Sequence, residues 1–221
     1  MALTHAPGET APRPASWDLP LALRRVLLLA PPLALAVLEV FHPQPDETAA
    51  ALMDVATWFV GFHAIQLALV GLVALTVLLL ADELGEAGKW TVRLGIGAFL
   101  VFYSAYDAVA GIGTGLAMRT ARDLTPAQQE GVFAIVKDWP SLDPFVFTLA
   151  VVGTLGWAVA LGALTFAARR AGAPRSQWIF LGLAGFFLLG GHPFPSGTLA
   201  FGSLFVAALL VSRAPREQSA P

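Results

Sequence analysis

The stretch that decides the fold is residues 58–81, WFVGFHAIQLALVGLVALTVLLLA, which contains no Asp, Glu, Lys or Arg. A helix needs about 20 mainly apolar residues to cross the hydrocarbon core of a bilayer, and this stretch is long enough. The rest of the chain agrees with it, because 57% of the 221 residues are hydrophobic and only 13% are charged. The sequence therefore predicts an all-α integral membrane protein.

Outward from this stretch, the same criterion finds further apolar segments on both sides. The fifth and sixth predicted spans are short, and we expect two short crossings there rather than one re-entrant hairpin. These spans form a predicted six-helix domain at 21–213, and residues 1–20 and 214–221 are predicted to be disordered cytoplasmic tails. The six predicted spans are 22–41, 58–81, 93–117, 145–168, 177–191 and 196–212.

The basic residues predict the orientation, because short loops rich in Lys and Arg stay on the cytoplasmic side. If both termini are cytoplasmic, only Arg119, Arg122 and Lys137 of the 13 basic residues lie outside. This bias favours an even number of spans, and it places the outer loops at 42–57, 118–144 and 191–195. The basic residues predicted inside are Arg13, Arg24, Arg25, Lys89, Arg93, Arg169, Arg170, Arg175, Arg213 and Arg216.

The long outer loop contains its own helix signal. Thr125 suits the N-cap, Pro126 the first helical position, and Gln128 the capping-box position. We therefore expect a short amphipathic helix at 126–137 that lies flat on the outer face. It would be either a lid over the site or a simple connector at the membrane interface.

Small residues are spaced for close helix contact on two spans. Ser104, Ala108, Gly111 and Gly115 form one stripe, and Gly153, Gly156 and Ala160 form another. Such stripes are typical of the contacts between helices in membranes.

Composition also excludes several classes of function. The chain contains no cysteine, so disulfides, thiolate metal ligands and iron–sulfur clusters are excluded. A formal net charge of −2 without a basic patch argues against a nucleic-acid partner. The preference for Arg over Lys and the absence of sorting signals lead us to expect a bacterial plasma membrane.

Two His-Pro motifs, His42-Pro43-Gln44-Pro45 and His192-Pro193-Phe194-Pro195, each follow an apolar run. Proline ends a helix, so each His is expected to be the last ordered residue of its span. The predicted topology places both at the outer rim, with His63 slightly below it. The three imidazoles are therefore predicted to lie close together.

Polar residues of the first three spans are predicted to join them. Charged groups in a membrane usually face the bundle interior, and Glu39 and Asp107 are the two that qualify. Glu39 shares a helix face with His42, and Gln66 shares one with His63. Tyr103 shares a face with Asp107.

This set is predicted to form a metal site, because three imidazoles near a carboxylate suit zinc or a related transition metal. His42, His63 and His192 are the predicted ligands, and Glu39 or Asp107 orients a ligand or acts as general base. Gln66 and Tyr103 are predicted to contact the bound group. A lipid-like ester or amide at the outer face would be the substrate of such a metal-dependent hydrolase.

Other interpretations remain open at this stage. Two histidines from different spans could hold haem b instead. The buried carboxylates could serve a small-molecule or proton-coupled transporter, or the chain could be an accessory subunit of another membrane protein. Each residue also has a purely structural interpretation. The His-Pro imidazoles would cap helix ends, and His63 with Gln66 would form only an interhelical hydrogen-bond pair. Asp107 would accept a hydrogen bond from Tyr103 or Tyr106 of its own helix, or from a neighbouring span.

Overall fold

The computed structural model describes residues 19–44, 48–83, 86–139, 143–191 and 194–213, and within these ranges the regular structure is entirely helical. Both predicted tails fall mostly outside them, so the domain limits stay a prediction. The helices are α1 (Leu21–Val40), α2 (Ala49–Leu80), α3 (Glu86–Ala98), α4 (Ser104–Asp107), α5 (Thr114–Ala121), α6 (Pro126–Val136), α7 (Pro144–Arg170), α8 (Arg175–Phe187) and α9 (Ser196–Arg213).

The described helices confirm a multi-pass helical architecture. Five of them are long and apolar enough to cross a membrane, namely α1, α2, the continuous run Gly88–Ala121, α7 and α9. The predicted fifth span corresponds to α8, which has 13 residues and continues into a 3-10 turn at Leu188–Gly190. Because α8 is shorter than a full crossing, the count of six spans stays a prediction.

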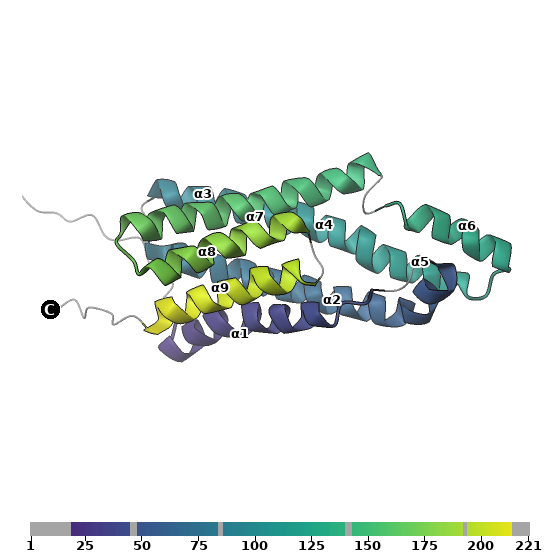
Figure 1. Ribbon diagram of the computed structural model, residues 1–221, viewed down its shortest axis with the longest axis horizontal. Coiled ribbons are helices and arrows are strands. Elements are labelled where there is room, and N and C mark those ends of the chain that lie inside the picture. Colours follow the sequence, from purple (N-terminus) through teal and green to yellow (C-terminus); the bar gives the residue numbers. More distant parts are fainter. Residues whose placement is uncertain (1–18, 45–47, 84–85, 140–142, 192–193, 214–221) are drawn as a thin grey trace, which may run out of the picture.

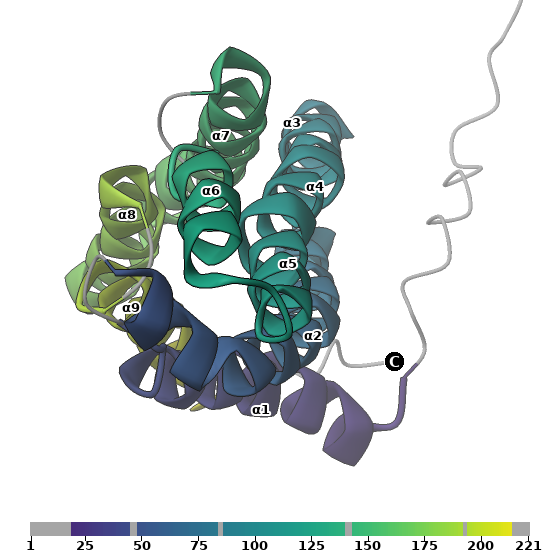
Figure 2. The ribbon, with the colours of Figure 1, turned by 90° about the vertical axis from the view of Figure 1, so that its right-hand side faces the viewer.

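The helices form an elongated bundle in which α9 packs between α1 and α8, and α7 packs on α8 and α3 (Figure 1). The view along the bundle shows α2 between α1 and the α3–α5 run (Figure 2). The first residues of α1 and the last residues of α9 lie at one end of the bundle, and we call this the α1/α9 end. At the other end, α2, α5 and α6 extend beyond α1, α8 and α9 (Figure 1).

Two segments differ from the sequence-based expectation. α2 begins at Ala49, nine residues before the predicted start at residue 58. Thr48 is its N-cap, and the Thr48 hydroxyl oxygen accepts the Ala51 N–H at 3.2 Å. The apolar pattern misses this part of the helix because it projects past the end of α1 and contains polar residues such as Asp54. The third span is a helix with two π-helical segments, Phe99–Tyr103 and Ala108–Gly113, on either side of α4.

The predicted helix in the long outer loop is present as α6. Its capping box forms as expected, and the Thr125 N–H donates to Gln128 Oε1 at 3.0 Å. Val136 of α6 is buried against Leu52 of α2 and Met118 of α5. The helix packs on α5, at the end of the bundle where α2 and α5 project (Figure 1). Its posture relative to the membrane surface stays a prediction.

The two small-residue stripes are packing surfaces, as predicted. A Cβ added to Gly156 would lie 2.6 Å from the Gly95 carbonyl oxygen, so α7 and α3 touch backbone to backbone. A Cβ on Gly115 would lie 2.7 Å from Val60 Cγ2 on α2. These approaches fix α3–α5 between α2 and α7 and so set the position of the polar residues on that run.

Candidate functional site

The structure brings most of the predicted site residues together near the C-terminal end of α1. His192 lies outside the described residues, and His42, just after α1, is partly exposed. The remaining residues are buried although they are polar or ionisable. Their exposed fractions are 0% for Glu39, 2% for His63, 0% for Gln66, 1% for Tyr103 and 1% for Asp107.

Glu39 is held between three helices. Gln66 Nε2 of α2 donates to Glu39 Oε1 at 3.1 Å, and both side chains are buried. On the other side, a Cβ added to Gly197 of α9 would lie 2.8 Å from Glu39 Cδ and Oε2. Gly197 therefore makes the space for this carboxylate. In the sequence, the one signal for Gly197 is a small residue at the start of the last span, which does not predict a contact with Glu39.

His63 has a defined orientation and tautomer. Its Nδ1 lies 2.7 Å from the Phe59 carbonyl oxygen, which only accepts, so Nδ1 carries the proton and donates it. The other nitrogen, Nε2, faces Asp107 Oδ1 at 3.9 Å. A Cβ on Gly111 would lie 2.2 Å from His63 Cδ2, so the glycine of span three admits the ring.

His42 completes an aromatic wall around this imidazole. Its ring centroid lies 5.2 Å from that of His63, with the planes nearly perpendicular, and 4.8 Å from that of Phe62. The cap of α1 is the preceding residue, Phe41, whose N–H bonds to Leu38 O. The side chain of His42 does not cap α1 and instead lies against the Phe59, Phe62 and His63 rings of α2.

Asp107 and Tyr103 reach the site from the irregular part of span three. The two π-helical segments flank Asp107, and π-bulges in helices are frequently found at functional sites. The Tyr103 ring stacks on Phe99 at 4.9 Å between centroids. The Tyr103 phenol is close enough to interact electrostatically with both carboxylates, and its interaction with Asp107 is stronger than that with Glu39.

Some buried polar atoms nearby have no hydrogen-bond partner among the described residues. They include Gln66 Oε1, Thr114 Oγ1 and Thr198 Oγ1. Thr114 lies on the same helical stripe as Asp107 and Gly111, and Thr198 follows Gly197. Buried polar atoms are normally paired with protein or water. These positions suit a polar ligand or ordered water.

The predicted three-histidine metal site is only partly represented. His42 and His63 are neighbours, and His192 is outside the described residues. Within the part of the chain that the structure describes, no group of three or more His, Asp or Glu side chains is arranged to hold a metal ion.

No known protein family, curated protein or solved structure matches this chain. Its function therefore has to be inferred from the chemistry of the site. Two carboxylates, two imidazoles and a phenol suit a bound cation or a proton-transfer reaction.

Proposed function

We propose that this protein is a six-span membrane protein of a bacterial plasma membrane, with both termini cytoplasmic, and that its buried site binds a divalent transition metal, most simply zinc. One observation carries the metal assignment. His63 donates Nδ1–H to the Phe59 carbonyl and directs Nε2 toward Asp107 Oδ1, 3.9 Å away. Metal-ligating histidines in proteins hold the second ring nitrogen in this way, on a carbonyl or carboxylate.

The chemistry of the pair is consistent with zinc. Zinc bonds to imidazole nitrogen are about 2.0–2.1 Å long and bonds to carboxylate oxygen about 2.0–2.2 Å long. One ion could therefore contact both His63 and Asp107 across the observed separation. His42 and His192 are the further ligands in this proposal, as the sequence predicts.

The rest of the site suits hydrolysis at the outer face. A bound zinc ion acidifies a water ligand, and Glu39, which Gln66 holds by a hydrogen bond of 3.1 Å, would accept its proton. Tyr103 would hydrogen-bond a substrate carbonyl. A lipid-like ester or amide is the expected substrate because the site lies among membrane helices near their outer ends.

The six-span topology is supported by the arrangement of the helix ends. The beginning of α1 and the end of α9 lie together, and α7 ends and α8 begins at this same end (Figure 1). An even number of passes returns the chain to the starting side. In the proposal, α8 and the Leu188–Gly190 turn make the short fifth pass.

The metal content of the purified protein tests the proposal. The chain is purified in detergent through a tag without histidine and dialysed, and its metals are measured by inductively coupled plasma mass spectrometry. We expect about one zinc per chain in the wild type and less than about a tenth of that in His63→Ala. His5→Ala removes the one histidine of the chain that is not a ligand in the proposal, and it is expected to retain the metal.

Other results would reject the assignment. A metal-free wild type, or equal metal in His63→Ala and His5→Ala, contradicts a site built on His63. A Soret band in the visible spectrum would replace zinc with haem b. A metal-free protein that acidifies vesicles in response to a solute would favour a proton-coupled transporter.

A further inference from the structure

The boundary between α1 and α2, which we call the α1/α2 seam, is the place where the buried site reaches the surface of the bundle. Among the described residues of the site, His42 is partly exposed, whereas the others are at most 2% exposed. The His42 ring lies against Phe59 and Phe62 of α2. The route from the surface to the site therefore runs along the seam at the C-terminal end of α1.

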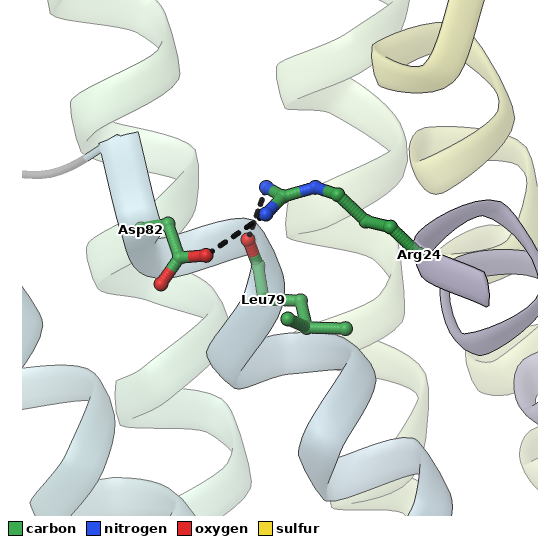
Figure 3. Close-up of polar contacts among 3 residues, drawn as sticks. All are labelled: Arg24, Leu79 and Asp82. Atoms are coloured by element: carbon green, nitrogen blue, oxygen red, sulfur yellow. Dashed lines mark hydrogen bonds and ion pairs between the residues drawn. The ribbon is translucent and has the colours of Figure 1, made fainter. Parts of the chain in front are cut away.

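At the α1/α9 end, the seam is closed by an ion pair. Arg24 of α1 places Nη1 at 3.0 Å from Asp82 Oδ2 and donates from Nη2 to the Leu79 carbonyl at 3.1 Å (Figure 3). Both charged side chains are mostly buried, at 12% and 19% exposed. Separating a buried ion pair is costly because each charge is left without its partner. The two helices are therefore firmly joined at this end.

The opposite end of the seam is held by an exposed contact instead. Trp58 Nε1 of α2 donates to the Phe41 carbonyl oxygen at 3.3 Å, and this hydrogen bond is exposed. The exposed fractions are 46% for Trp58 and 62% for Phe41. Water at the membrane interface can replace either partner of such a hydrogen bond, so breaking it costs little free energy. The seam therefore opens more readily here than at the ion pair.

A row of aromatic rings leads from this exposed contact to the imidazole of the proposed metal site. The Trp58 ring packs on Phe62 with 5.9 Å between centroids, and Phe62 packs on His63 with 5.2 Å between centroids. Phe62 itself is fully buried. A group that enters beside Trp58 is thus two ring contacts away from His63.

Trp58 also begins an exposed apolar stripe on α2. Ile65 and Leu72 continue the stripe, and they are 50% and 42% exposed. A Cβ added to Gly61 would meet nothing within 4 Å, so the surface is open next to Trp58. At 1.5 Å per residue the stripe is about 21 Å long, which exceeds half of the roughly 30 Å hydrocarbon thickness of a bilayer. It can therefore contact the whole acyl chain of a lipid in one leaflet.

On the basis of the metal site proposed above, we propose that its substrate is a long-chain lipid that enters from the outer leaflet through the α1/α2 seam. The ester or amide carbonyl lies at the metal beside His63, and the acyl chain lies along the α2 stripe. Trp58 determines the specificity for a long chain, because its ring covers the start of the chain where the seam opens. A small molecule with the same head group binds the metal without these apolar contacts.

Binding of two hydroxamic acids to the zinc-loaded protein tests this proposal, because a hydroxamate is a zinc ligand in place of the ester or amide. Palmitohydroxamic acid has a long chain, and acetohydroxamic acid has only a methyl group. Each is titrated separately in the same detergent and measured by native mass spectrometry. We expect Trp58→Ala to bind palmitohydroxamic acid about tenfold more weakly than the wild type, since an aromatic anchor is lost. Acetohydroxamic acid is expected to bind both proteins alike.

The matched control is Trp90→Ala, which removes another exposed tryptophan, 56% exposed on α3. It is expected to bind both acids like the wild type. Trp58→Phe guards against misfolding, because it keeps a ring and loses only the indole N–H. It is expected to bind palmitohydroxamic acid within about twofold of the wild type.

Equal binding of palmitohydroxamic acid by Trp58→Ala and Trp90→Ala would overturn the entry proposal and leave the metal site intact. Equal weakening for both acids in Trp58→Ala would also overturn it, because the chain would then make no difference. A zinc-loaded wild type that binds neither acid would contradict the metal site itself, and the entry proposal with it.

Discussion

At the scale of single residues, two glycines determine where the ionisable side chains of the site can lie. Gly111 leaves space for the His63 ring and Gly197 leaves space for the Glu39 carboxyl group. Neither glycine has a chemical function of its own. Each lets a side chain from a neighbouring helix occupy the place that a Cβ would fill.

Gly111→Ala is therefore expected to disturb the site directly. The new Cβ would lie 2.2 Å from His63 Cδ2, so the imidazole must rotate away from the Phe59 carbonyl. We expect a loss of about 1–3 kcal/mol in stability from overpacking. Zinc content is expected to fall together with it. Thermal unfolding in detergent and metal analysis measure the two effects.

Gly97→Ala is the matched control for that prediction, because a Cβ there meets nothing within 4 Å. It is expected to leave metal content unchanged and to alter the melting temperature little. If both variants behave alike, the close packing of Gly111 against His63 is not what positions the ring.

The pH dependence of metal binding is a second prediction at this scale. Protons compete with the metal for imidazole nitrogen, so binding weakens as pH falls. We expect zinc to be retained at pH 7.5 and largely released after dialysis at pH 5. Metal content that is the same at both values would argue against histidine ligation.

At the scale of elements, the contact between α1 and α2 depends on a proline and a threonine. Pro31 inside α1 has no N–H, so the Leu27 carbonyl four residues earlier loses its helical donor. Thr76 of α2 donates its hydroxyl to this carbonyl at 2.6 Å, and its side chain is fully buried. The carbonyl group that lacks a donor within α1 is thus hydrogen-bonded by a side chain of α2.

Thr76→Val is expected to destabilise the protein by about 1 kcal/mol, since a buried carbonyl would lose its donor. For a chain of this size, that corresponds to a fall of about 2–4 °C in melting temperature. The control is Thr165→Val, because the hydroxyl of Thr165 donates to the Leu161 carbonyl of its own helix at 2.7 Å and, among the described residues, to no other helix. If the melting temperature of Thr76→Val falls no further than that of Thr165→Val, the hydrogen bond between α1 and α2 does not contribute to stability.

The sequence predicts elements better than it predicts their exact course. The limits of α6, α7 and α9 follow from caps and apolar length, and the glycine stripe on α7 correctly marks a packing face. The early start of α2 is missed because residues 49–57 include polar groups and extend past α1. The π-helical segments around Asp107 have no simple sequence signal, since they arise from packing of the whole run.

The same limit applies to the site. Spacing along single helices predicts that Glu39 shares a face with His42 and that His63 shares one with Gln66. It does not show that Gln66 bonds across to Glu39, or that His63 bonds to the Phe59 carbonyl. Contacts between helices depend on rotation and depth, which helix periodicity alone does not determine.

At the scale of the whole molecule, the predicted topology can be tested cleanly because the chain contains no cysteine. Ala127 of α6 and Ser176 of α8 are both exposed, and α6 and the beginning of α8 lie at opposite ends of the molecule (Figure 1). In intact cells, a membrane-impermeant maleimide is expected to label Ala127→Cys and not Ser176→Cys. Labelling of both would show that the proposed orientation is wrong.

In the proposed site, one metal ion joins α2 to the α3–α5 run through His63 and Asp107. X-ray absorption at the zinc edge of the purified protein tests it most directly. We expect nitrogen and oxygen ligands at about 2.0–2.1 Å with outer-shell imidazole scattering, and loss of that scattering in His63→Ala. A spectrum with oxygen ligands alone, or one that is unchanged in His63→Ala, would contradict it.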